Sequence, residues 1–118
     1  RKVVPNGAGT STRVLGQYVR DEGLLSLSDA IARLSLYPAQ RLEAFAPVFA
    51  QKGWIKVGAD ADIVIFDPAT VAAKASYEAP FETPSGIHSV WVAGQLSVQH
   101  GELVEGAGAG EKLISSTL

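Results

Sequence analysis

The chain has 118 residues, 47% of them hydrophobic, with a formal net charge of −2 and no cysteine. This length fits one small domain with a hydrophobic core, but not a complete (β/α)₈ barrel, which needs about 250 residues. The weak negative charge argues against nucleic acid and anionic membrane surfaces as partners. No apolar run reaches the roughly 18 residues of a membrane span, so we expect no membrane partner. A sequence without cysteine offers no disulfide framework and is compatible with the cytoplasm, the location we expect.

Two or three helices with short links are predicted in the first third of the chain. Residues 1–10 are rich in proline, asparagine and glycine, which is typical of a loop. A serine or threonine after this loop can cap a helix over Arg13–Glu22. A second helix is predicted behind the cap residue Ser26, and its apolar positions follow the spacing i, i+3, i+4 and i+7: Leu27, Ala30, Ile31 and Leu34. Pro38–Glu43 is predicted as a short third helix.

The rest of the chain has β patterns. Trp54–Val57 alternates apolar and polar residues and predicts a strand with one face toward water. Ile63–Phe66 is a continuous β-branched and aromatic run, which predicts a strand buried on both faces. Between these runs, Asp60 and Asp62 are predicted to stabilise a turn by bonding nearby backbone amides. Two aspartates two residues apart could also form an acid–base pair, but the turn is the favoured interpretation.

A hairpin and a last short strand are predicted near the end of the chain. Ile87–Val92 and Gln95–Gln99 flank a two-residue turn, in which glycine can adopt a positive φ. Leu103–Val104 is predicted as the last strand, and Ala69–Ala75 as a single helical turn followed by a loop over Ser76–Gly86. The predicted fold class is therefore α+β, with two or three helices followed by a small, mainly antiparallel β-sheet.

Three stretches resemble one family. Residues 53–67 follow the pattern G-x-I-x-x-G-A-x-A-D-I-V-I-F-D, which resembles the segment after the catalytic barrel in the amidohydrolase superfamily of metal-dependent hydrolases. Residues 16–42 resemble the last barrel helices of the N-acyl-D-amino-acid deacylases within that superfamily, and residues 77–94 resemble their closing strands. The resemblance covers roughly residues 5–110.

This resemblance implies an arrangement in two parts. Residues 1–45 would form a helical segment like the last barrel helices. Residues 46–118 would form a β-rich segment like the C-terminal half of a composite β-sandwich, whose other strands come from the N-terminus of the full protein. Strands and helices without their neighbours leave unpaired edges and apolar faces. We therefore expect the chain to pair with the remainder of the parent enzyme or to self-associate as a homo-oligomer.

No catalytic or metal-ligating residue is predicted in this chain. The superfamily uses an early His-x-His pair, two later histidines and an aspartate, which in the resembled proteins lies just before the segment matching residues 1–5. This chain has only His88 and His100, neither in such a motif, and ordinary strand or turn histidines are expected. Glu78 and Glu82 have no histidine or serine nearby in sequence and are expected in solvent. We expect no cofactor in this chain and one or two divalent metals, zinc foremost, in the full-length parent.

The only candidate for substrate proximity is the glycine-rich stretch before the first predicted helix. Free amides at a helix N-terminus can hold an anion, although the Lys-Ser/Thr ending of a P-loop is absent. In the resembled deacylases this stretch lies near the mouth of the active site, which implies that Asn6, Gly7 and Thr10 lie close to substrate. A plain connection is the alternative interpretation.

Two hypotheses for function remain. The chain is a C-terminal fragment of an amidohydrolase-type enzyme that hydrolyses C–N bonds, with N-acyl-D-amino acids as the substrate class, and the fragment alone is inactive. Alternatively, it is a non-catalytic structural or interaction module that docks on a partner chain or self-associates.

Overall fold

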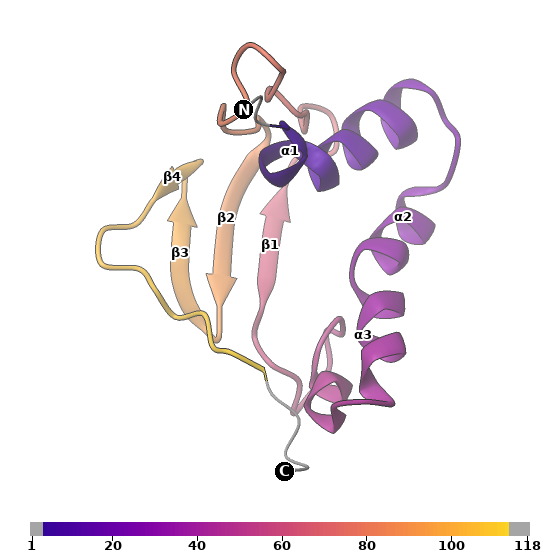
Figure 1. Ribbon diagram of the computed structural model, residues 1–118, viewed down its shortest axis with the longest axis vertical. Helices are drawn as coiled ribbons and strands as arrows, with labels where there is room; N and C mark the ends of the chain where they lie inside the picture. The colour runs from indigo at the N-terminus through magenta and orange to yellow at the C-terminus, as the bar shows by residue number, and fades with distance from the viewer. Residues whose placement is uncertain (1–3, 114–118) are drawn as a thin grey trace.

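A four-stranded antiparallel sheet lies beside a group of helices in the computed structural model, which describes residues 4–113 (Figure 1). The strands are adjacent in the order in which the chain forms them: β1 (Ile63–Phe66), β2 (Ile87–Val92), β3 (Gln95–Gln99) and β4 (Glu102–Leu103). The predicted α+β class with a small antiparallel sheet is confirmed.

The helical part begins earlier than predicted. Helix α1 (Asn6–Arg13) continues without a break into η1 (Val14–Asp21), a π-helical stretch whose last turn includes a bond from the amide of Glu22 to the carbonyl of Gln17 at 2.9 Å. The predicted loop over residues 1–10 is therefore wrong for the described residues from Asn6 onward. Gly9 of this helix packs closely on Ala73 and Ala75, a contact that offsets the poor helix propensity of glycine.

The next two helices agree more closely with the sequence. Helix α2 (Leu27–Leu34) is capped as predicted, since the hydroxyl oxygen of Ser26 accepts a hydrogen bond from the amide of Asp29 at 3.1 Å. Helix α3 (Leu36–Glu43) begins two residues before the predicted start and carries Pro38 in its first turn, where a missing amide costs little. A 3₁₀ turn, η2 (Pro47–Gln51), leads away from the helices.

The hairpin between β2 and β3 is confirmed. Ala93 and Gly94 form its two-residue turn with φ values of 49° and 77°, the positive values that a tight hairpin of matching twist requires. The last strand was predicted one residue too late. Val98 pairs with Leu103 and Gln99 pairs with Glu102, so β4 is a short outer strand of the sheet.

The predicted strand Trp54–Val57 is wrong. No strand pairs with it in the part of the chain that the structure describes, and a turn closes at its end through a 3.1 Å bond from the amide of Ala59 to the carbonyl of Lys56. Ile55 is 93% exposed and Val57 is fully exposed. The alternation of apolar and polar residues is therefore not enough to form a strand here, because a strand also needs a partner strand.

Strand β1 forms where predicted but is not buried on both faces. It pairs with β2 on one side only within residues 4–113, so it is an edge strand. Its first three residues remain 38–51% exposed, and only Phe66 is half-buried. An apolar run of this kind normally indicates burial. The exposed edge and apolar side chains make β1 a surface that favours a further partner.

One hydrophobic core joins the helices to the sheet. Leu15 in η1, Ala30 in α2 and Val71 are its buried centre, and half-buried residues from both parts pack around them: Val14, Val19, Leu25, Leu27, Leu34, Phe66 and Ile87. Val71 follows a turn at residues 67–70, and Ala72 then bridges to Ser85, so the predicted helical turn is shorter than expected. The division at residue 45 into two segments stays a prediction. No helix within residues 4–113 is both long and apolar enough to cross a membrane.

Candidate functional site

A depression of about 260 Å³ lies along the first helix. Its lining includes Asn6, Thr10, Arg13 and Tyr18, which lie one turn apart along the face of α1 and η1. An amide, a hydroxyl, a guanidinium and a phenol are groups that bind polar or anionic ligands. This depression is the candidate functional site, because it includes two of the three residues expected near a substrate.

The three predicted residues lie in the first two turns of α1. Asn6, Gly7 and Thr10 are all exposed, and they belong to a helix rather than to a loop before one. The hydroxyl of Thr10 donates to the carbonyl of Asn6 at 2.7 Å, and the amide of Ala8 donates to the carbonyl of Pro5 at 3.2 Å. The backbone amides from Ala8 onward are therefore used within the helix. Whether these residues contact a substrate stays a prediction.

The neighbouring face of the same helix, which shares Gly9 with the depression, packs closely on residues 71–75. A Cβ atom built on Gly9 would lie 3.2 Å from the Cβ of Ala73, and one built on Gly16 would lie 2.4 Å from the carbonyl oxygen of Val71. Gly9 and Gly16 are both buried, as is Thr12 between them. These small residues bring the helix backbone against the segment between β1 and β2 and so fix the orientation of the candidate site.

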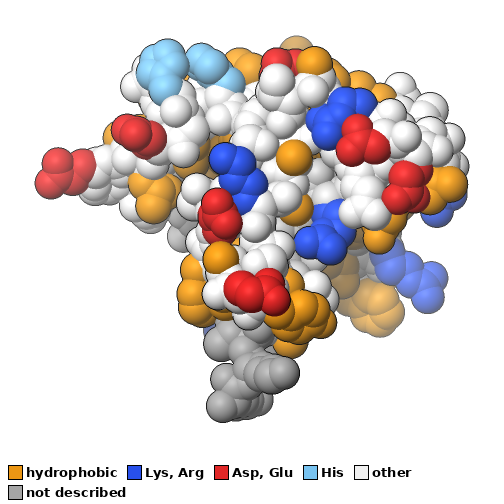
Figure 2. Space-filling model, turned by 90° about the horizontal axis from the view of Figure 1, so that it is seen from above, with side chains coloured by type: hydrophobic (Ala, Val, Ile, Leu, Met, Phe, Trp, Pro, Cys, Tyr) orange, Lys and Arg blue, Asp and Glu red, His pale blue; other side chains and the backbone are white. Residues whose placement is uncertain are grey.

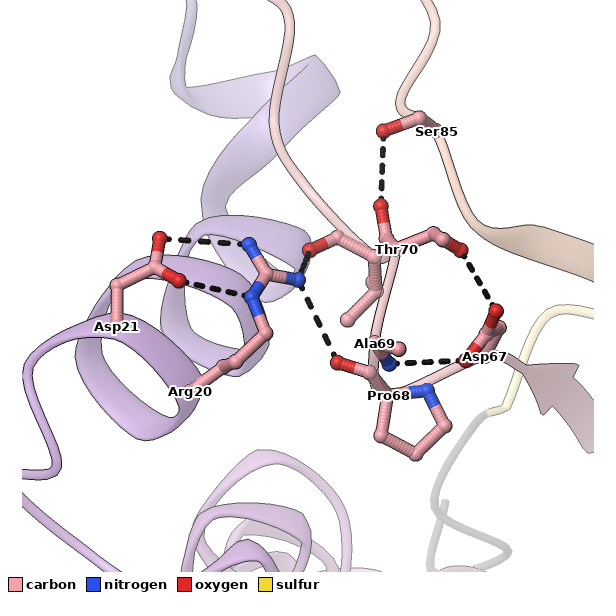
Figure 3. Close-up of polar contacts among 8 residues, drawn as sticks. Arg20, Asp21, Asp67, Pro68, Ala69, Thr70 and Ser85 are labelled. Atoms are coloured by element: carbon pink, nitrogen blue, oxygen red, sulfur yellow. Dashed lines mark hydrogen bonds and ion pairs between the residues drawn. The ribbon is translucent and has the colours of Figure 1, made fainter.

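Arg20, near the other end of η1, stabilises the same contact between the helix and the segment that joins β1 to β2 (Figure 3). Its guanidinium donates to the carbonyl oxygen of Val71 at 2.7 Å and is paired with the carboxylate of Asp21 at 2.8 Å, which raises the pKa of the arginine. Within the turn, Asp67 accepts bonds from the amide of Ala69 at 2.8 Å and the hydroxyl of Thr70 at 3.1 Å. The turn is thereby held in the shape that presents its carbonyls to Arg20.

A second polar cluster joins the chain before β1 to the hairpin. The ammonium of Lys52 lies 2.6 Å from a carboxylate oxygen of Asp62 and 3.0 Å from one of Asp60. The other oxygen of Asp62 accepts a bond from the amide of Ala93 at 2.9 Å. Asp60 and Asp62 thus bind a lysine and a distant hairpin amide rather than the amides of their own turn, which corrects the sequence prediction. The hydrogen bond from Lys52, and then that from Ala93, lower the pKa of Asp62.

Replacing Asp62 by asparagine is expected to lower the free energy of unfolding by about 1 kcal/mol or less, because the pair is partly exposed. Because the folded-state pKa of Asp62 is lowered, its contribution is present above the unfolded pKa of about 4 and is lost as pH falls through the folded value. Urea unfolding should show a smaller difference between wild type and Asp62→Asn at pH 3 than at pH 6. An equal difference at both pH values would contradict this assignment.

The possible metal ligands of the described residues are spread over the chain. Within residues 4–113, no group of three or more histidine, cysteine, aspartate or glutamate side chains is arranged to hold a metal ion. Glu78 and Glu82 are exposed in the loop before β2. Hydrolytic zinc centres use about three protein ligands and an open position.

Sequence reasoning missed one pairing. His88 and His100 are twelve positions apart, but the β2–β3 hairpin places them side by side, with ring centroids 4.8 Å apart and nearly perpendicular planes. Only the predicted hairpin register could have revealed this contact, because neither residue lies in a recognisable motif.

The chain belongs to the amidohydrolase family, whose model matches residues 4–98. It is 45% identical over 86 residues to a D-aminoacylase of Alcaligenes xylosoxydans xylosoxydans, covering 73% of this chain and 17% of that protein. An N-acyl-D-glutamate deacylase of the same organism is 43% identical over 88 residues, with the same coverage. The chain therefore spans about a sixth of the length of these relatives.

Solved structures of D-aminoacylases and related deacylases also match this chain. A D-aminoacylase described as defining a novel subset of amidohydrolases matches with a TM-score of 0.85 at 38% identity, over 95% of this chain and 22% of that one. An N-acyl-D-glutamate deacylase from Bordetella bronchiseptica, complexed with zinc and a phosphonate inhibitor, matches with a TM-score of 0.72 at 41% identity, over 80% of this chain and 19% of that one. The arrangement of helices and sheet is thus that of the corresponding part of these enzymes.

Proposed function

We propose that this chain works as part of an amidohydrolase-type enzyme that hydrolyses the amide bond of N-acyl-D-amino acids in the cytoplasm. The observation that carries the proposal is the identity of 40–45% to three relatives named D-aminoacylase, N-acyl-D-aspartate deacylase and N-acyl-D-glutamate deacylase. The names indicate substrates with different amino-acid side chains, but in each case the substrate is an acylated D-amino acid. That shared chemistry defines the proposed substrate class.

The proposed enzyme contains one or two divalent metals, with zinc supported by the zinc-bound neighbour from Bordetella bronchiseptica. Because residues 4–113 supply no group of three suitable ligands, the proposal assigns the metal ligands to residues elsewhere in the enzyme. The role of this chain is then to position other groups. Asn6, Gly7 and Thr10 on α1 are proposed to lie near the substrate, with Arg13 in the same depression as a cation for its carboxylate.

The remainder of the enzyme is also the proposed partner of the exposed apolar surface. Within residues 4–113 no strand pairs with the second edge of β1, and the segment before β1 exposes Trp54, Ile55 and Val57. Large apolar side chains gathered on neighbouring segments favour a protein interface. The same observation supports self-association of the chain by itself, the second candidate, in which two copies cover this surface for each other.

A chimera tests the proposed function. Residues 4–113 of this chain, which include β4, replace the corresponding segment of the D-aminoacylase whose structure matches 95% of this chain. The chimera is expected to bind zinc and to hydrolyse N-acetyl-D-amino acids, whereas a matched variant with a glycine-serine linker of equal length in that segment should be inactive. A folded, zinc-loaded chimera that hydrolyses none of these substrates would overturn the proposal.

A further inference from the structure

We propose that His88 and His100 form an open site for a late first-row divalent metal ion, with Cu²⁺ bound most tightly. Both side chains are exposed, and Figure 2 shows the two pale blue histidines next to each other at the surface. This inference is independent of the proposed hydrolytic function and uses residues to which that function assigns no role.

The sheet register places the two rings together. Ser89 pairs with Gln99 at the end of the β2–β3 ladder, and His88 and His100 are the residues just beyond this pair, with His100 in the turn between β3 and β4 at a φ of 51°. The amide of Gly101 donates to the carbonyl of His88 at 3.1 Å, which fixes the backbone at this point. This bond and the pairing of Ser89 with Gln99 hold the two histidines next to each other. The backbone therefore pre-positions two imidazoles, so that little ordering is needed for both to bind one ion.

The ring geometry allows both imidazoles to reach one ion. Metal–nitrogen bonds of roughly 2.0–2.1 Å require the two nitrogens to lie about 3 Å apart. The centroids are 4.8 Å apart in an edge-to-face arrangement, and the χ2 rotation of the exposed His100 ring is broad enough to turn one of its nitrogens toward Nε2 of His88. Water would occupy the other coordination positions.

A neighbouring side chain leaves one nitrogen of His88 available. Its Nδ1 is hydrogen-bonded to the hydroxyl of Ser89, a residue that is itself buried. A second partner on one ring nitrogen orients the imidazole and leaves Nε2 for a metal, as in well-studied metal sites. Imidazole ligands suit copper, nickel and zinc, and the affinity order of divalent ions places Cu²⁺ first.

The test titrates the 118-residue chain with Cu²⁺ at neutral pH. Calorimetry should give one ion per chain, and electron paramagnetic resonance should show two coupled imidazole nitrogens. His88→Gln and His100→Gln should each weaken binding at least tenfold and leave one coupled nitrogen, whereas Gln99→Ala, an exposed neighbour, should bind as wild type does. Circular dichroism checks that each variant is folded.

Other results would overturn the site. Two independent imidazoles would bind two ions, and each single variant would keep one of them with unchanged affinity. Sedimentation showing two chains per ion would assign the histidines to a bridge between molecules instead. If the wild-type chain binds Cu²⁺ no more tightly than the double variant His88→Gln/His100→Gln, the ion binds elsewhere on the chain.

Discussion

Replacing Gly16 by alanine is expected to destabilise the chain by about 1–3 kcal/mol, the usual cost of forcing an extra methyl group into a packed site. The new Cβ would lie 2.4 Å from the carbonyl oxygen of Val71 and 3.2 Å from the Cα of Ala72, both backbone atoms that cannot move aside alone. In a solvated helix the same change stabilises by up to about 1 kcal/mol. Here the collision outweighs that gain.

Gly7 provides the matched control for this prediction. It lies in α1, and a Cβ added there meets nothing within 4 Å. Gly7→Ala should therefore raise the free energy of unfolding by about 0.5–1 kcal/mol. Urea unfolding of both variants gives the comparison. Stabilisation by Gly16→Ala would show that the helix does not approach residues 71–75 as closely as the structure indicates.

Replacing Val64 by lysine is expected to affect the chimera far more than the chain alone. Val64 lies in the middle of β1 and is 51% exposed, so the isolated chain should change by no more than about 0.5 kcal/mol. If the remainder of the enzyme covers this edge, the substitution places an unpaired ammonium in the interface, which costs about 3–5 kcal/mol. The chimera should then lose most of its stability and activity.

Leu103→Lys is the control for the opposite edge of the sheet. Leu103 lies in β4 and is 85% exposed. Thermal unfolding and deacylase activity of both variants, measured in the chimera and in the isolated chain, separate the two edges. An unchanged Val64→Lys chimera would contradict the proposed covering of β1. Light scattering of the isolated chain tests the alternative. If the wild-type chain is a dimer and Val64→Lys is a monomer, this edge mediates self-association instead.

The sequence predicted most of the elements, because their signals are local. Ser26 capped α2 as expected, and the Ala93-Gly94 dipeptide closed the hairpin. The errors arose where the structure depends on distant segments. The glycines of α1 indicate a loop when read alone, but one of them, Gly9, packs against residues 71–75. Trp54–Val57 has the pattern of a strand without a partner strand in the described part of the chain.

The candidate site could be predicted less well than the fold. Asn6 and Thr10 were placed near a possible ligand through family resemblance, and nothing in their spacing alone indicated the depression that they line with Arg13. The contact between His88 and His100 depends on register, which sequence fixes only through the turn. Lys52 joining Asp60 and Asp62 was missed for a similar reason, since a turn prediction considers only neighbouring backbone amides.

The strand pairs of the sheet differ greatly in how far apart the two strands lie in the sequence. β2, β3 and β4 follow each other through tight turns, whereas β1 reaches β2 only after the long excursion through Val71 and Ser85. Contacts close in sequence form fastest, because little chain entropy is lost in closing them. During folding, the three later strands should therefore assemble as a meander before β1 arrives. Until it does, β2 rather than β1 is the exposed edge, and that interval is when newly made chains are most prone to pair wrongly with each other.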